Sequence, residues 1–141
     1  MKKLYVFFSV FALFFLVSCG KESAESELTL VSNRTSRIAG TWTYDKVFLN
    51  GIDITSSVLG ANDEYTFQFT QQGEYFFSYS YAGQFYSDSG SWLFTDGIKN
   101  ITITNNLGQV DTYKILRLTI FEMWWSATDG IDTYEYHFKV K

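Results

Sequence analysis

The chain contains no proline, a single cysteine (Cys19) and a single histidine (His137) in 141 residues. One cysteine forms no disulfide within the chain, and one cysteine with one histidine is too few ligands for the usual zinc sites. Nucleophilic catalysis by serine or threonine needs a base beside the hydroxyl, and His137 is the one conventional candidate. No spacing gives it an acid or a nucleophile, so we expect no enzyme, no metal site and no cofactor.

The sequence also lacks an apolar run of the length that a spanning helix takes, about 20 residues. Its longest apolar stretch, residues 4–16, stops short of that length. Two lysines precede this stretch and a Val-Ser pair follows it, which is the layout of a bacterial secretory signal. We therefore expect residues 1–18 to be a signal peptide for export.

Positive charge is scarce as well. Once the signal is removed, 9 of the 11 basic side chains face 15 acidic ones, a net charge of about −6. An acidic surface without a basic stripe argues against nucleic acid as a partner. It also argues against electrostatic docking on anionic lipid.

The end of the signal, Leu16-Val17-Ser18-Cys19, resembles the bacterial lipobox, in which the cysteine is acylated and the peptide is cut before it. The resemblance implies a lipoprotein of the bacterial cell envelope, held at the outer membrane by acyl chains such as palmitate on Cys19. Each buried CH₂ contributes about 0.8 kcal/mol, so two or three chains anchor firmly. Its face, periplasmic or surface-exposed, stays open. The alternative is an ordinary secreted protein with a cysteine near its cleavage site.

Residues 19–38 are mostly polar or charged, and they contain no aromatic side chain. This composition is typical of a flexible tether, joining the lipid anchor to a folded domain at residues 39–141. Within that domain, residues 52–62 are long enough to be more than a turn, with a short helical piece at 56–59. No other helical periodicity is expected.

From residue 39 onward, aromatic and β-branched residues alternate with polar ones, the pattern of half-buried strands. Aromatic residues make up 20% of the whole chain. Turn dipeptides such as Asn50-Gly51 and Asp129-Gly130 supply the positive φ angles of tight turns. The pattern predicts eight strands, at residues 41–49, 64–71, 74–81, 84–94, 99–104, 110–117, 119–126 and 131–140.

Eight consecutive strands with short turns predict an all-β fold, an antiparallel up-and-down meander. Closure into an eight-stranded barrel removes the exposed strand edges. A barrel of this size holds packed side chains or one small ligand. A membrane-spanning barrel fits less well, because a lipobox and such a barrel seldom occur together.

Gly40-Thr41-Trp42, at the start of the first strand, resembles the Gly-x-Trp motif of lipocalins, whose tryptophan closes one end of the barrel. Together with the lipobox, the tether, Gly73-Glu74-Tyr75, Gly90-Ser91-Trp92 and residues 113–119, it resembles small bacterial lipocalin-like lipoproteins over nearly the whole mature chain. The resemblance implies a lipocalin-like barrel, with Arg117 as the basic residue that covers Trp42. Avidin-type barrels also begin with Gly-Thr-Trp, so they stay an alternative.

Strand parity predicts which side chains point inward. Tyrosines are numerous for a dry core, where each hydroxyl needs a partner, and a ring-rich mouth suits a flat or sugar-like ligand. Trp124, Tyr86 and Phe76 are expected outside, as a surface for a protein or glycan partner, and His137 is expected on the surface. The candidate cavity residues are Trp42, Tyr44, Phe67, Phe69, Tyr75, Phe77, Tyr79, Trp92, Tyr113, Trp125, Tyr134 and Tyr136, with Met123 among them.

Two functions follow from this pattern. In the first, the anchored barrel binds a small apolar or aromatic ligand non-covalently. In the second, the same rings pack a solid core, and the outer face or the loops meet another envelope protein or a glycan. Oligomeric state and ligand identity stay open.

Overall fold

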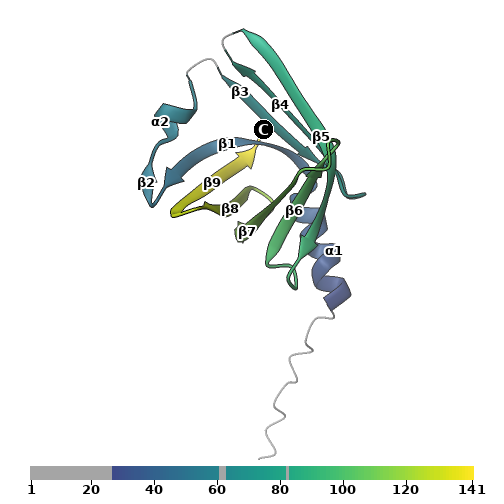
Figure 1. Ribbon diagram of the computed structural model, residues 1–141. Coiled ribbons are helices and arrows are strands. Elements are labelled where there is room, and N and C mark those ends of the chain that lie inside the picture. The colour runs from purple at the N-terminus through teal and green to yellow at the C-terminus, as the bar shows by residue number, and fades with distance from the viewer. Residues whose placement is uncertain (1–26, 61–62, 82) are drawn as a thin grey trace, which may run out of the picture.

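The computed structural model describes residues 27–60, 63–81 and 83–141 (Figure 1), so the predicted signal and Cys19 lie outside the described residues. The chain is mostly β-strand, as predicted. The elements, in chain order, are α1 (Glu27–Ile38), β1 (Gly40–Leu49), β2 (Ile52–Asp53), α2 (Thr55–Val58), β3 (Glu64–Phe69), β4 (Glu74–Tyr81), β5 (Gln84–Thr95), β6 (Asn100–Asn105), β7 (Val110–Leu118), β8 (Glu122–Asp129) and β9 (Asp132–Val140).

The strands form one antiparallel sheet in up-and-down order, and pairing of β1 with β9 closes it into a barrel of eight main strands. This confirms the predicted barrel and is compatible with a lipocalin-like fold. The two residues of β2 pair with the end of β1. The short helical piece expected at 56–59 is α2, which begins one residue earlier.

The eight main strands begin within one residue of their predicted starts, with one exception. The seventh was expected at 119–126, but β8 begins at Glu122. The Thr119 hydroxyl accepts hydrogen bonds from the amides of Phe121 (3.2 Å) and Glu122 (2.9 Å), and the Thr119 amide donates to the Glu122 carbonyl. These bonds form a turn, which delays the start of the strand.

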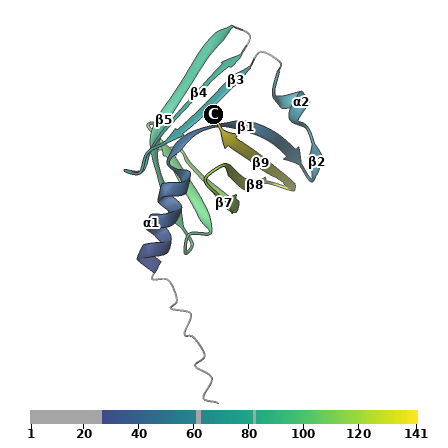
Figure 2. The same cartoon turned by 180° about the vertical axis from the view of Figure 1, so that it is seen from behind.

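Residues 27–38 form helix α1, although the sequence predicted a flexible tether at residues 19–38 and no helical periodicity there. Contacts with the barrel explain the difference. Ile38 is buried in the core at 1% exposure, and the Arg34 guanidinium donates a 2.8 Å hydrogen bond to the Ile98 carbonyl. Figure 2 shows α1 at one end of the barrel, below β1 and β5. The folded unit therefore begins before residue 39.

The buried core lies at the α1 end, which we call the closed end. Trp42 is 1% exposed there, and its indole Nε1 donates a 2.8 Å hydrogen bond to the carbonyl of Ile38. Trp42 thus faces inward at one end of the barrel. The core cluster consists of Ile38, Trp42, Phe67, Phe69, Tyr75, Trp92, Ile101, Met123, Trp125 and Phe138.

Toward the other end, β5 separates from β6, and β1 separates from β3. β5 pairs with β4 over residues 84–91 but with β6 only over residues 90–95. Gly90 lies where β5 begins to pair with β6. A Cβ on Gly90 would lie 2.1 Å from the Thr104 carbonyl oxygen, so only glycine fits there. β1 likewise pairs with β3 only over residues 40–42. In Figure 1, β3, β4 and β5 consequently rise away from β8 and β9.

Trp42→Phe tests the closed end. The change keeps an aromatic ring but leaves the Ile38 carbonyl without its indole donor and opens a small void. We expect the free energy of unfolding, measured by urea denaturation, to fall by about 2 kcal/mol. Trp124→Phe, at a half-buried tryptophan on the outside of the barrel, is the control and should cost less. Equal losses in the two variants would contradict the role of Trp42.

Candidate ligand-binding mouth

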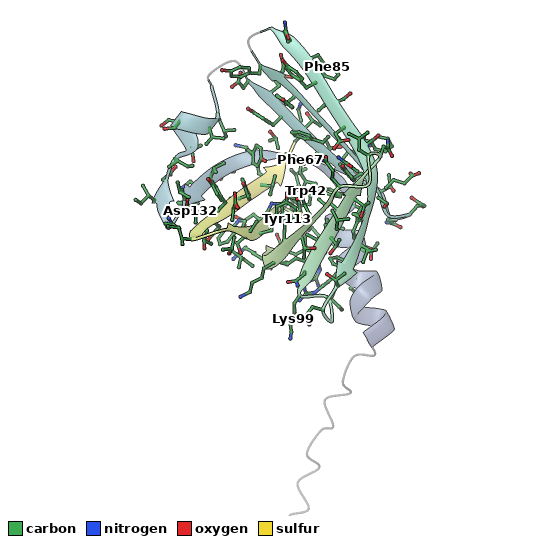
Figure 3. The ribbon with its side chains drawn as sticks, in the orientation of Figure 1. Trp42, Phe67, Phe85, Lys99, Tyr113 and Asp132 are labelled. Carbon is green, nitrogen blue, oxygen red and sulfur yellow. The ribbon has the colours of Figure 1, made fainter. Side chains whose placement is uncertain are left out.

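The end opposite α1 is lined by inward-facing tyrosines, and we call this set of side chains the mouth. It consists of Tyr44, Tyr65, Tyr79, Tyr86, Tyr113, Tyr134 and Tyr136, with the carboxylates of Asp88 and Asp111. Figure 3 places Trp42, Phe67 and Tyr113 near the centre of the barrel. In the same view, Phe85 and Asp132 mark the tips of two hairpins and Lys99 lies at the α1 end.

One wall of the mouth is a ladder of three stacked tyrosines. Tyr65, Tyr79 and Tyr86 are direct partners in the register of β3, β4 and β5. The ring centroids of Tyr65 and Tyr79 are 5.5 Å apart with 4° between the planes. Those of Tyr79 and Tyr86 are 4.8 Å apart at 12°. Stacking across strands on one face stabilises this part of the sheet.

Tyr44 joins this wall to the core. Its ring packs edge-on against Tyr65 and Phe67, at 5.3 and 5.1 Å, and it stacks on Phe138 at 4.8 Å. On the opposite wall, Tyr113 stacks on Trp125 at 4.8 Å. The mouth thus has an aromatic floor that is continuous with the closed end.

Some tyrosine hydroxyls in and near the mouth have a hydrogen-bond partner in the protein, and others do not. The Tyr75 hydroxyl, just below the mouth, donates to Asp88 at 2.9 Å, and the Tyr86 hydroxyl donates to Gln84 at 3.0 Å. The hydroxyls of Tyr44, Tyr113 and Tyr136 have no such partner within the described part of the chain. None of these three oxygens is fully buried, because no fully buried side-chain oxygen of the described residues lacks a hydrogen-bond partner. Solvent or a ligand therefore reaches these three groups.

Burial keeps these phenols uncharged. It raises the pKa of Tyr113 to about 12, and the negative charges of Asp111 and of an ionised Tyr136 add to the effect. Burial, followed by the neighbouring phenols, also raises the pKa of Tyr44 well above its ordinary value, and it raises the pKa of Tyr136. At neutral pH all three side chains can donate a hydrogen bond.

The charge inside the mouth is negative. Asp88 and Asp111 lie at inward positions of β5 and β7, opposite Phe77 and Ile103. No Lys, Arg or His occupies an inward position on a described strand. Asp111 forms no hydrogen bond or ion pair with a described residue. The mouth therefore favours a neutral or cationic group over an anion.

The predicted cavity residues separate into a core and a mouth. Trp42, Phe67, Phe69, Tyr75, Trp92, Trp125 and Met123 are buried at the closed end, while Tyr44, Phe77, Tyr113 and Tyr136 are half-buried against that core. Tyr79 and Tyr134 are half-buried nearer the rim. The prediction missed Phe138, Ile101 and Tyr65, although the alternation of β9, β6 and β3 contains each of them at the correct parity.

Arg117 does not cover Trp42, which corrects the role implied by the resemblance. A register shift between Ile115 and Arg117 puts Arg117 opposite Trp124 on the outside. The guanidinium carbon lies 5.0 Å from the centre of the Trp124 ring, and its Nε is 2.7 Å from Glu122. The contact that seals the closed end is made by Ile38 instead.

Two of the three outer residues lie as predicted. Trp124 faces outward and is half-buried, because its ring stacks on His137 at 4.0 Å and 2°. The same stacking leaves His137 half-buried, although we expected a surface residue. Phe76 faces outward and is 47% exposed. Tyr86 was expected outside but faces inward, because it shares the parity of Trp92 and pairs with Tyr79.

A pH titration tests the buried phenols. Because their pKa values in the folded state exceed the unfolded value near 10, their contribution to stability is complete below pH 10 and is lost as the pH rises toward 12. Tyr113→Phe should make the unfolding free energy fall less steeply over this range, by at most about 1.4 kcal/mol per pH unit. Denaturation at several pH values measures the slope, and an unchanged slope would contradict the burial of Tyr113.

In the described ranges 27–60, 63–81 and 83–141, no three His, Cys, Asp or Glu side chains gather closely enough to hold a metal ion. The described helices are all too short or too polar to cross a membrane. No known protein-family model matches the chain, and no curated protein sequence matches it significantly.

Proposed function

We propose that the protein is a lipid-anchored lipoprotein of the bacterial cell envelope whose barrel binds a small apolar or aromatic molecule in its mouth. The lipobox-like Leu16-Val17-Ser18-Cys19 supports the anchor. The observation that carries ligand binding is the set of three phenol hydroxyls, on Tyr44, Tyr113 and Tyr136, that face the mouth without a partner from the described protein.

The depth of the site follows from the packing. The closed end is filled by the protein's own rings and aliphatic side chains, so a ligand enters only the half lined by tyrosines. Small-molecule sites are mostly apolar surfaces with a few polar groups that fix orientation. Here the aromatic rings that line the mouth supply the apolar surface, and the hydroxyls of Tyr44, Tyr113 and Tyr136 supply the orienting groups.

The charge of the mouth narrows the ligand class. An anionic ligand would lie near Asp88 and Asp111 with no inward basic side chain to neutralise it. A neutral ring suits the site, and an amine attached to a ring suits it better, because cations are attracted both to carboxylates and to aromatic faces.

A second candidate is an interaction module that docks through the rim of the mouth. Three exposed apolar side chains favour it, on turns or strand ends at that end of the barrel: Phe85 at 73%, Leu107 at 84% and Ile131 at 95% exposure. A protein partner would cover these residues, and the core below would act only as support.

Cys19→Ser tests the anchor in the full-length chain. If Cys19 carries the acyl groups, the variant loses labelling by a palmitate analogue and moves from the membrane fraction to the soluble fraction. Lys21→Ala, two residues further along, should keep both properties. Retention of the label by Cys19→Ser would contradict the anchor.

A matched pair of aromatic ligands tests the mouth. Phenethylamine and phenylpropionate share a ring and a short chain but differ in charge. We expect the amine to quench the tryptophan fluorescence of the protein at lower concentration than the acid. Asp111→Asn should weaken amine binding about fivefold, while Asp96→Asn, at the closed end, leaves it unchanged. Tighter binding of the acid, or no binding of either compound, would contradict the proposed site.

A further inference from the structure

The outer face of the β3–β4–β5 wall carries a groove that is distinct from the mouth. Its volume is about 410 Å³, within the range of small-molecule sites. A second hollow of about 290 Å³ continues it and shares Phe76, Ser89 and Asn106. We propose that this outer groove binds a neutral saccharide. The proposal does not depend on the function proposed for the mouth.

The floor of the groove is a grid of outward-facing side chains, set by the register of three strands. One row runs across the strands as Thr66, Ser78 and Ser87. The next row runs as Gln68, Phe76 and Ser89. The Phe76 ring therefore lies at the middle of the second row, with an amide on one side and a hydroxyl on the other.

The turn between β6 and β7 forms the groove's wall. The Asn106 amide donates a 3.0 Å hydrogen bond to the Ser89 carbonyl, and its Nδ2 donates one of 2.8 Å to the Ser89 hydroxyl. These bonds hold Asn106 and Leu107 against β5. Gly90 permits the arrangement, because any larger residue would collide with the Thr104 carbonyl.

The lining chemistry matches an uncharged sugar. Hydroxyl and amide side chains both donate and accept hydrogen bonds, as sugar hydroxyls do. The exposed face of Phe76 offers an apolar platform for the C–H face of a sugar ring. A phosphate or a carboxylate would find no Lys or Arg among the lining residues.

Of the charged groups near the groove, Asp88 and Lys141 have partners, and Glu74 lines the second hollow. Asp88 is the one charged residue that lines the larger hollow, but it occupies an inward position of β5. Its carboxylate accepts from the Tyr75 hydroxyl at 2.9 Å and from the Ser89 amide at 2.8 Å. The Lys141 ammonium donates to the Thr66 hydroxyl at 2.7 Å and lies 3.9 Å from Glu64. A neutral ligand therefore has no charge that would compete for these contacts of Asp88 and Lys141.

The test uses the full-length protein in a detergent that carries no sugar. Two probes are titrated: a tetramer of glucose and a tetramer of N-acetylglucosamine. Saturation-transfer NMR reports which probe binds and which of its ring protons contact the protein. We expect at least one probe to bind and Phe76→Ala to weaken its binding about tenfold. Gln68→Ala should weaken the binding less.

Phe85→Ala is the matched control, because Phe85 is also exposed but is not part of the groove lining. It should bind the saccharide as the unmodified protein does, and so should Tyr113→Phe in the mouth. Urea midpoints of the variants show that each is folded. The proposal is overturned if neither tetramer binds, or if Phe76→Ala binds as tightly as Phe85→Ala.

Discussion

The buried indole of Trp42 is the contact on which the rest of the structure depends. It lies near the start of β1 and hydrogen-bonds the Ile38 carbonyl, at the last residue of α1. It also belongs to the core cluster, to which seven of the eight main strands contribute a buried side chain and β7 contributes partly buried ones. Because one side chain joins helix, first strand and core, the closed end is held together by packing and by this hydrogen bond. In a chain with one cysteine, burial of this kind is the main source of stability.

Because one end of the barrel is closed, phenylalanine and tyrosine occupy different positions along the barrel axis. Along β9 the inward positions change from Phe138 in the core to Tyr136 and Tyr134 toward the mouth, and along β3 they change from Phe69 and Phe67 to Tyr65. A phenol buried without a partner is costly, whereas a phenyl ring is not. Tyrosine therefore lies where solvent or a ligand reaches it, and Tyr75, deeper in the barrel, has Asp88 as its acceptor.

Much of this arrangement could be predicted from the sequence, because alternation along a strand reports directly on burial. It identified the eight strands, the barrel and many of the inward-facing side chains, but it missed Phe138, Ile101 and Tyr65. It failed where the cause is not local. Helix α1 forms on contacts made by Arg34 and Ile38, and the register shift before Arg117 reverses the parity. Tyr86 was assigned to the wrong face although its parity was readable from Trp92.

The outer groove was beyond sequence reasoning for a different reason. Its rows combine residues from three strands, and only the register between strands brings Gln68, Phe76 and Ser89 side by side. The sequence contains each residue but not the alignment. Single positions such as Phe76 could be recognised as exposed, but the grid around them could not.

The mouth and the outer groove are two faces of the same wall, and this links their geometries. Over residues 84–88, β5 pairs with β4 while its described pairing with β6 begins only at Gly90. The wall there depends on its own cross-strand contacts, which include the Tyr65–Tyr79–Tyr86 ladder. Because side chains alternate between the two faces of a strand, the backbone register that stacks these rings inside also sets the grid outside. The stacked tyrosines thus maintain the spacing of the groove as well as the shape of the mouth.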